Sequence, residues 1–422
     1  MFVLALGLIV RTLFISLHER PLISDEKEYD QLAFSIASLS SYSYGENPTA
    51  YRPVGYPALV GVAYFVLGRH SIAVKFAQGF LDVGTAFLIF LLLAPYSRRT
   101  GVLGALLWVL FPPAILYTNF LMTETTFTFL LTLAVVLMLR GAKDSIGFIL
   151  LLGITLGMLI LMKPGALLFL LIPAILYRKL QFSRTALVAT LATALLVITP
   201  WSIRNYVTFG DISLSSNGGI NFLIGNHPGT NGAYNLTFDP SILEGASNEF
   251  EVESRASHYA TRYITHHPDM FLINAVKKLA HLFESEGGIL VWSFHPHPED
   301  TSIRFASKYQ GISPLLSLLT NLPYMLLMFV GIFGFVSAKK DSTWWVFVIM
   351  GGIWLGIHIL FFGGSRFHFP MMPFVLCSAA LALANPLSTF KGLTSRQLVS
   401  ALIVASALLA LWMYEGFIIL NA

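Results

Sequence analysis

Long apolar stretches recur along this 422-residue chain and divide it into a series of candidate membrane spans. Runs of about 17–25 apolar residues are long enough to cross the hydrocarbon core of a bilayer as an α-helix. The pattern predicts eleven spans, over residues 2–17, 73–94, 100–117, 121–140, 146–162, 165–178, 185–200, 314–337, 343–362, 367–385 and 398–418. We therefore expect an all-α, polytopic membrane protein.

Basic residues fall on alternate connections between these spans. They are Arg98, Arg99, Arg140, Lys143, Arg178, Lys179, Arg184, Lys339, Lys340, Lys391 and Arg396. Because loops rich in Lys and Arg stay in the cytoplasm, this side is predicted to be cytoplasmic. Two long segments, 18–72 and 201–313, then lie on the opposite, outward side. The predicted parts are an N-terminal transmembrane module (1–200), an extracytoplasmic loop domain (201–313) and C-terminal transmembrane helices (314–422).

The first outward loop carries a hydrophobic pattern of its own. Tyr29, Leu32, Ala33 and Ile36 recur at helical spacing, which predicts an amphipathic helix over 26–39 that lies along the membrane interface. The polar side chains on this helix then face water or a site at the membrane surface.

Three further segments are predicted in the outward loops. An apolar segment at 56–68 is too short to span the bilayer, so we expect it to re-enter the membrane or lie on it. Residues 246–265 and 269–284 have helical patterns, which makes the second outward loop a small covering domain.

The composition agrees with a membrane protein and excludes several other classes. The chain is 55% hydrophobic and only 11% charged, with a mean hydropathy of +0.71. It contains no P-loop, no Gly-rich fingerprint after a strand and no alternation of strands and helices, so a soluble nucleotide-binding domain is not expected. The net charge of +4 reflects membrane topology and does not indicate nucleic-acid binding. The lone Cys377 excludes thiolate metal sites and disulfides within the chain.

An acidic cluster, Ser24-Asp25-Glu26-Lys27-Glu28-Tyr29, follows the first span. Asp25 as the N-cap and Glu28 as its N3 partner would form a capping box for the interfacial helix. Asp25 and Glu26 also suit a general base or an ion ligand at the membrane–water boundary. The two interpretations are compatible, since one carboxylate can cap while its neighbour reacts. Glu124 opens the fourth span on the outward side and is a second acidic candidate, although a first-turn Glu also stabilises its helix.

Four cations lie near the outward ends of helices: Arg52, Lys163, Arg204 and Arg366. Any one of them alone could extend its side chain towards lipid headgroups. The positive-inside rule, however, disfavours basic residues close to spans on the outward side. Their number therefore indicates an anionic ligand, most simply a lipid phosphate.

Two other sets of polar residues are interpreted as structural. Arg11, in the middle of the first span, is predicted to pair with Asp82 inside the helix bundle. The second set lies in the second outward loop and consists of His266, His267, His295, His297, Glu299 and Asp300. Prolines hold this second set extended and its spacing matches no zinc site, so solvated loop histidines are expected.

Taken in order, short motifs along nearly the whole chain resemble those of the GT-C glycosyltransferases. The similar branch is the family 39-like group, which includes protein O-mannosyltransferases and the aminoarabinose transferase of lipid A. The motifs are Asp25-Glu26, Tyr51-Arg52-Pro53-Val54-Gly55-Tyr56-Pro57, Glu124, Lys163-Pro164, Pro200-Trp201, Arg204-Asn205, and Arg366-Phe367 with Pro370 and Pro373.

The resemblance implies a GT-C fold and a sugar donor linked to polyprenyl phosphate, with catalysis on the extracytoplasmic side. Asp25 matches the position of the expected base. Lys163, Arg204 and Arg366 match positions that hold the lipid phosphate. If the source is bacterial, the carrier would be undecaprenyl phosphate, and the protein would lie in the inner or cell membrane with its site facing the periplasm or the cell exterior.

The resulting hypothesis is an inverting displacement at the anomeric carbon, with Asp25 as base and Glu26 beside it. Glu124, Arg52 and Tyr56 would orient the sugar or the acceptor, which is a glycan, lipid or protein. Cations alone can handle a phosphate leaving group, so no metal or other cofactor is expected, although the sequence leaves a divalent ion open. The rival interpretations are a lipid or oligosaccharide transporter or flippase without bond-breaking chemistry, and a non-catalytic binding protein.

Overall fold

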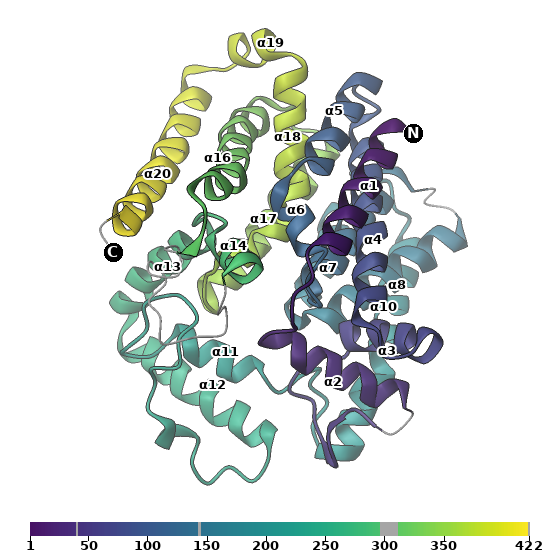
Figure 1. Ribbon diagram of the computed structural model, residues 1–422, viewed down its shortest axis with the longest axis vertical. Coiled ribbons are helices and arrows are strands. Elements are labelled where there is room, and N and C mark those ends of the chain that lie inside the picture. The colour runs from purple at the N-terminus through teal and green to yellow at the C-terminus, as the bar shows by residue number, and fades with distance from the viewer. Residues whose placement is uncertain (39–40, 142–144, 296–310, 421–422) are drawn as a thin grey trace.

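The computed structural model describes residues 1–38, 41–141, 145–295 and 311–420 (Figure 1). Helices dominate, and the two short strands β1 (Ser43–Tyr44) and β2 (Asn47–Pro48) form an antiparallel pair. The long apolar helices are α1 (Phe2–Leu17), α4 (Ser71–Leu93), α5 (Arg98–Val109), α7 (Thr123–Arg140), α8 (Ile146–Met162), α10 (Arg184–Phe209), α16 (Pro314–Ser337), α17 (Ser342–Leu360), α18 (Met372–Ala384) and α20 (Ser395–Leu420). Shorter helices beside them are α6 (Pro112–Tyr117), η1 (Pro164–Leu170), α9 (Leu171–Leu176), η4 (Ser365–Phe367), η5 (Phe369–Met371) and α19 (Pro386–Lys391).

The chain is an integral, multi-pass membrane protein. In the described parts, seven helical segments are long and apolar enough to cross a bilayer, and shorter apolar helices lie beside them. Two predicted spans are interrupted. The span at 100–117 breaks between α5 and α6, just before Pro112, and the span at 165–178 is formed by η1 and α9. The count of eleven spans therefore stays a prediction, whereas the all-α membrane architecture is confirmed.

The first outward loop folds as its pattern predicts. The helix predicted over 26–39 is α2 (Asp25–Ala37), and the short apolar segment predicted at 56–68 is α3 (Gly55–Leu67). The two helices pack closely at Gly61, where a Cβ would touch the Ile36 side chain and the Ala33 carbonyl. The opposite side of α3 leaves Val62, Phe65 and Val66 exposed, as expected for a helix that contacts lipid.

The helix of the seventh predicted span extends beyond that span. Pro200 lies inside α10, and this helix continues to Phe209 before Gly210 ends it with a φ of 78°. The boundary at 200/201 between the predicted parts stays a prediction. Beyond it lie α11 (Gly218–Gly225), η2 (Pro240–Leu243), α12 (Glu249–His266), α13 (Pro268–Leu282) and α14 (Gly287–Phe294). The predicted helices at 246–265 and 269–284 are confirmed.

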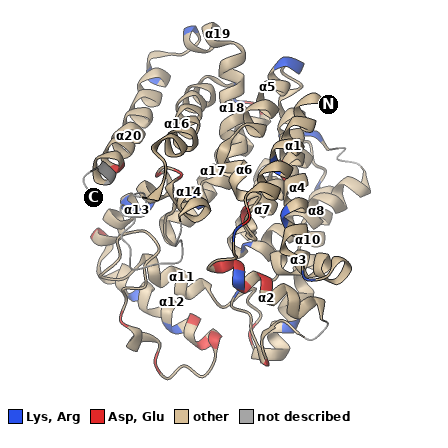
Figure 2. Ribbon diagram, in the orientation of Figure 1, with Lys and Arg blue, Asp and Glu red and all other residues tan. Residues whose placement is uncertain are grey.

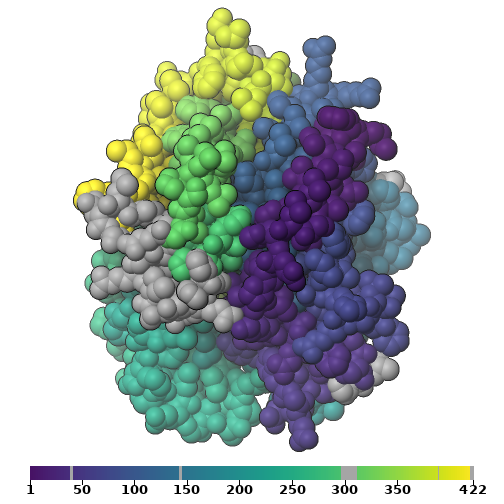
Figure 3. Space-filling model, viewed as in Figure 1, coloured from purple at the N-terminus to yellow at the C-terminus, as the bar shows by residue number. Residues whose placement is uncertain are grey.

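The two outward loops contact each other at one end of the molecule, where their purple and teal surfaces meet (Figure 3). Thr49 Oγ1 donates a 2.9 Å hydrogen bond to the Glu249 carboxylate, and the Ser216 amide donates to the Ala50 carbonyl at 3.0 Å. A parallel bridge joins Ala233 to Gly363. The covering loop is thereby fixed to both the first outward loop and the turn that precedes α18.

A buried ion pair lies inside the helix bundle. Arg11 donates to Asp82 Oδ2 at 2.6 Å and to the Val109 carbonyl at 2.6 Å, and both side chains are almost fully buried. The predicted Arg11–Asp82 pair is confirmed. Its full set of partners explains how a guanidinium is tolerated at this depth.

Candidate active site

Asp25 is the first residue of α2. Acidic and basic residues gather around this helix (Figure 2). The N-cap is Ser24, with a φ of 47°, and no side chain caps the helix. The capping-box interpretation of Asp25 and Glu28 was therefore wrong. The Asp25 carboxylate binds two guanidiniums instead: Oδ1 accepts from Arg52 Nη2 at 2.7 Å, and Oδ2 accepts from Arg366 Nη1 at 2.9 Å.

The two guanidiniums reach Asp25 from distant parts of the chain. Arg52 precedes α3, and its Nε also donates to Glu28 at 2.6 Å. Arg366 lies in η4, 341 residues from Asp25 in the sequence. The Arg366 guanidinium also packs over Phe367 at 4.9 Å and over Trp292 at 6.0 Å, measured to the ring centroids. The first outward loop and the turn before α18 are thus joined at one carboxylate.

This arrangement makes Asp25 strongly acidic. Burial alone would raise its pKa, but the positive charges of Arg366 and Arg52 outweigh burial and lower the pKa to about 2. The Asp25 side chain is 18% exposed, so it remains partly accessible. It is an ionised carboxylate held by two guanidiniums.

A second ion pair lies beside the first. Lys163, the C-cap of α8, places its Nζ 3.3 Å from Glu124 Oε1, and Glu124 stands buried in the first turn of α7. The Lys163 Nζ also lies 5.6 Å from the centroid of Phe367, the ring that contacts Arg366. Burial lowers the pKa of Lys163, whereas the Glu124 carboxylate opposes that shift. The structure therefore brings together Asp25, Arg52, Arg366, Lys163 and Glu124.

Three predicted site residues have other contacts. Glu26 is fully buried, and its carboxylate accepts four hydrogen bonds, from Arg20 (2.9 and 2.6 Å), the Ile23 amide (3.1 Å) and the Leu121 amide (2.7 Å). Tyr56 is buried and donates to Gln78 Oε1 at 2.8 Å. These contacts tie both side chains to the scaffold, and the site roles predicted for them stay predictions.

Arg204 is the third of these residues. Its guanidinium donates to the Thr49 carbonyl at 2.8 Å and to the Tyr42 carbonyl at 3.0 Å. It also packs over Trp201 at 4.8 Å. Arg204 thus joins α10 to the first outward loop, and no contact described for it reaches Asp25.

Sequence reasoning missed two residues that contact this cluster. Glu28 was assigned only to capping, although it lies three residues after Asp25 on the same side of α2 and binds Arg52. Helical spacing alone could have suggested this. Trp292, in α14, contacts Arg366 across the fold, and no local pattern in the sequence indicates that contact.

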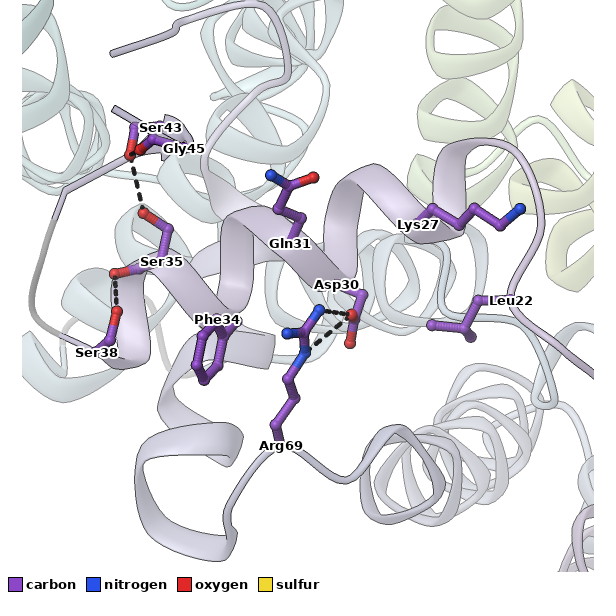
Figure 4. A pocket seen from close by; sticks show the side chains of 10 residues that line it. All are labelled: Leu22, Lys27, Asp30, Gln31, Phe34, Ser35, Ser38, Ser43, Gly45 and Arg69. Atoms are coloured by element: carbon purple, nitrogen blue, oxygen red, sulfur yellow. Dashed lines mark hydrogen bonds and ion pairs between the residues drawn. The ribbon is translucent and has the colours of Figure 1, made fainter. Parts of the chain in front are cut away.

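A hollow of about 530 Å³ lies on the other side of α2 (Figure 4). Its lining includes Lys27, Gln31 and Phe34, which helical spacing places roughly opposite Asp25. Its Arg69 and Asp30 side chains are bonded to each other, at 3.1 Å from Nε to Oδ2. This hollow is separate from the Asp25 cluster, and we place the candidate chemistry at the cluster, where charges converge.

Across the described ranges, no three His, Cys, Asp or Glu side chains are grouped as a metal site. His266 and His267 are exposed. His297, Glu299 and Asp300 lie outside the described residues. The expectation that no metal is needed stays a prediction.

Comparison with known proteins places the fold. Neither a protein-family model nor a curated protein matches the chain. The oligosaccharyltransferase of Archaeoglobus fulgidus in its apo form is similar in structure, with a TM-score of 0.50 and 14% identity over 96% of this chain and 54% of that one. For the oligosaccharyltransferase AglB of the same organism, in complex with an inhibitory peptide and a dolichol-phosphate, the TM-score is 0.48 and the identity is 14%, over 97% of this chain and 55% of that one. For ArnT from Cupriavidus metallidurans bound to undecaprenyl phosphate, the TM-score is 0.45 and the identity is 12%, over 93% of this chain and 77% of that one.

The likeness to the apo oligosaccharyltransferase confirms that this chain has the GT-C fold. The chain spans about half the length of that protein. At this level of identity the likeness concerns the fold, and the function has to be argued from the residues of this chain.

Proposed function

We propose that this protein is a glycosyltransferase that moves a sugar from a polyprenyl-phosphate donor to an acceptor hydroxyl at its outward face. The observation that carries the proposal is the Asp25 cluster. One partly exposed carboxylate and three cations, Arg52, Arg366 and Lys163, converge at the outward ends of helices in a GT-C fold. A carboxylate suits the acceptor proton, and the cations suit a phosphate leaving group.

The reaction is a single displacement. The acceptor oxygen attacks the anomeric carbon while the bond between that carbon and the phosphate oxygen breaks. The acceptor proton passes to Asp25, and the bonding electron pair leaves with the polyprenyl phosphate. Lys163 and Arg366 stabilise the charge that grows on this phosphate. A single displacement inverts the anomeric configuration.

Donor binding would also change the basicity of Asp25. In the protein without substrate, Asp25 is held by Arg366 and Arg52, and its pKa of about 2 makes it a weak base. A bound phosphate competes with Asp25 for Arg366, and a carboxylate that loses a guanidinium becomes more basic. Asp25 would then be strengthened as a base when the donor is in place. The remaining contact with Arg52 keeps it oriented.

The acceptor-side assignments extend the proposal. Glu124 and Arg52, which belong to the Asp25 cluster, would orient the sugar or the acceptor. The acceptor is a glycan, lipid or protein hydroxyl. None of the hydrogen bonds described for Arg204 and Tyr56 reaches the cluster, so their assigned roles depend on substrate contacts. On the predicted topology, the site faces the periplasm or the cell exterior.

The test is release of free polyprenyl phosphate from a panel of polyprenyl-phosphate sugars by purified protein in liposomes. Asp30→Asn is the matched control, because Asp30 lies on the same helix and is also paired with an arginine, Arg69. We expect one donor to turn over, with loss in Asp25→Asn and retention in Asp30→Asn. Lipid movement across the bilayer without release of phosphate would favour the transporter instead. Loss of turnover in EDTA, restored by a divalent ion, would overturn the expectation that no metal is needed.

A further inference from the structure

A buried acid–histidine pair lies beside the Asp25 cluster but has no part in the reaction described above. Glu286, just before α14, and His368, between η4 and η5, are joined by a 2.9 Å hydrogen bond from Oε1 to Nε2. Their side chains are 0% and 3% exposed. Over the described ranges, the other Glu286 oxygen has no hydrogen-bond partner, so His368 is the contact that this carboxyl group makes.

Hydrogen-bond roles fix the number of protons in the pair. His368 Nδ1 lies 2.7 Å from the Leu282 carbonyl, which only accepts, so Nδ1 carries a proton. The bond between Nε2 and Glu286 then needs one more proton, located on either partner. The pair is neutral overall in both arrangements, which suits its complete burial.

The pair joins two elements that hold Arg366. His368 follows η4, two residues after Arg366, and Glu286 immediately precedes α14, which carries Trp292. Arg366 packs against both elements, over Phe367 at 4.9 Å and Trp292 at 6.0 Å.

The rest of the junction is tightly packed. The His368 ring stacks on Tyr324 with centroids 4.6 Å apart. The Glu286 amide donates to Asn321 Oδ1 at 2.8 Å. A Cβ on Gly288 would lie 3.2 Å from Ser365 Oγ. The relative position of η4 and α14 therefore has little freedom while the pair is intact.

We propose that Glu286 and His368 are positioning residues, which lock η4 to α14 and so hold the Arg366 guanidinium where it meets Asp25 and the donor phosphate. The phosphate role of Arg366 rests on the function proposed above, whereas its contact with Asp25 is part of the fold. A guanidinium displaced by about 1 Å would stabilise the leaving phosphate poorly.

The first experiment distinguishes a role of the Glu286–His368 hydrogen bond from a role of the acidic proton. In Glu286→Gln the side-chain amide can donate to the neutral His368 Nε2, so the bond is kept while the acid is removed. In Glu286→Leu the bond is lost and the volume is nearly conserved. We expect kcat within about threefold of wild type for Glu286→Gln and a fall of about 10- to 100-fold for Glu286→Leu, with a smaller change in KM.

Glu415→Gln is the matched control. Glu415 is also largely buried and accepts from the Ser285 amide at 3.0 Å, but it has no described contact with η4. Its activity should stay near that of wild type. Equal losses in Glu286→Gln and Glu286→Leu would assign the effect to the proton and overturn the positioning role. Wild-type kcat in Glu286→Leu would overturn it as well.

A second experiment needs no turnover and so stands apart from the proposed function. Asp25→Asn weakens the contact with Arg366, and we expect it to lower the apparent unfolding temperature of the wild-type protein. In the Glu286→Leu background this lowering should shrink, because Arg366 is already displaced, whereas in the Glu415→Gln background it should persist. An equal lowering in all three backgrounds would contradict the proposal.

If Glu286→Leu folds poorly, a second variant takes its place. His368→Phe in the Glu286→Gln background keeps a ring on Tyr324 and leaves no unpaired charge, so the same comparison is made there. If the coupling is found but no donor turns over, the positioning role holds and the glycosyltransferase proposal fails. If a donor turns over without this coupling, the positioning role fails alone.

Discussion

Asp25 and Glu26 are neighbours in the sequence, yet the fold treats them in opposite ways. Glu26 is completely buried, and its partners are Arg20 and two backbone amides. Asp25 keeps 18% of its side chain exposed and is held by two guanidiniums, one of them from the far end of the chain. A carboxylate bound to main-chain amides is part of the scaffold. A carboxylate that stays partly exposed and is bound to charged side chains could exchange those partners for a substrate.

The two carboxylates also differ in what they organise. Glu26 accepts from the Leu121 amide, so it ties the start of α2 to the segment that leads into α7. Asp25 gathers Arg52 and Arg366, the cations that we propose to meet the donor. Glu26 is thus part of the scaffold, whereas Asp25 is the residue that we propose as the base. Substitutions at the two positions should therefore fail in different ways.

Glu26→Gln should give the largest effect, and the effect should be on stability. Removing this acid leaves the buried Arg20 guanidinium without its counter-charge, which typically costs about 3–5 kcal/mol. We expect a large fall in the unfolding temperature, with near-normal turnover for each molecule that remains folded. The measurement is thermal unfolding beside activity normalised to folded protein. Loss of turnover in stable protein would place Glu26 in the chemistry.

Arg366→Ala should have the opposite effect, a loss of activity with the stability largely retained. Removing one donor to the developing charge should lower kcat by about 10²–10³-fold, equivalent to about 2.7–4 kcal/mol, while the fold persists. Steady-state kinetics and circular dichroism on the same preparation test this. Arg69→Ala, which removes the guanidinium bound to Asp30 across α2, is the control and should keep its activity. Equal losses in both variants would contradict the assignment.

Acid should weaken the ion pairs of Asp25 and thereby lower the stability of the fold. The pKa of Asp25 is lowered from 3.8 to about 2, so its ionised form stabilises the fold above pH 4. This contribution, about 2 kcal/mol, should be lost as the pH falls from about 4 through 2. The measurement is the unfolding temperature against pH for wild type and Asp25→Asn. The two curves should converge at low pH, and a constant gap would contradict the ion pairs.

Arg204→Ala should have the smallest effect on the reaction. Its guanidinium holds the Tyr42 and Thr49 carbonyls, so its loss should loosen the first outward loop and lower the unfolding temperature. We expect kcat to change by less than about tenfold. A loss as large as that of Arg366→Ala would return Arg204 to the phosphate site that the sequence predicted.

Hydrophobic length and periodicity were sufficient to predict the all-α membrane architecture, the helix α2 and the helices of the covering loop. They failed where the chain departs from simple periodicity, as at the break before Pro112 and at Pro200, which α10 accommodates. A proline near the outward end of a long helix can be tolerated, because neighbouring segments satisfy the freed carbonyl. Sequence alone does not distinguish these two outcomes.

The site was predictable in its residue types but not in its pairings. Asp25, Lys163, Glu124, Arg52 and Arg366 were all singled out by charge near outward helix ends. Their partners depend on tertiary contacts across up to 341 residues, which no local pattern encodes. Glu26 and Arg204 carry the same signal in the sequence, yet the fold directs Glu26 to Arg20 and two backbone amides and Arg204 to backbone carbonyls.

The most direct test of the central claim is release of polyprenyl phosphate by Asp25→Asn compared with Asp30→Asn, each reconstituted in liposomes beside wild type. Loss of the general base should reduce turnover by about 10²–10⁴-fold in Asp25→Asn, while Asp30→Asn stays close to wild type. Turnover by Asp25→Asn at the wild-type rate would show that this carboxylate only binds its two arginines, and would contradict its role as the base.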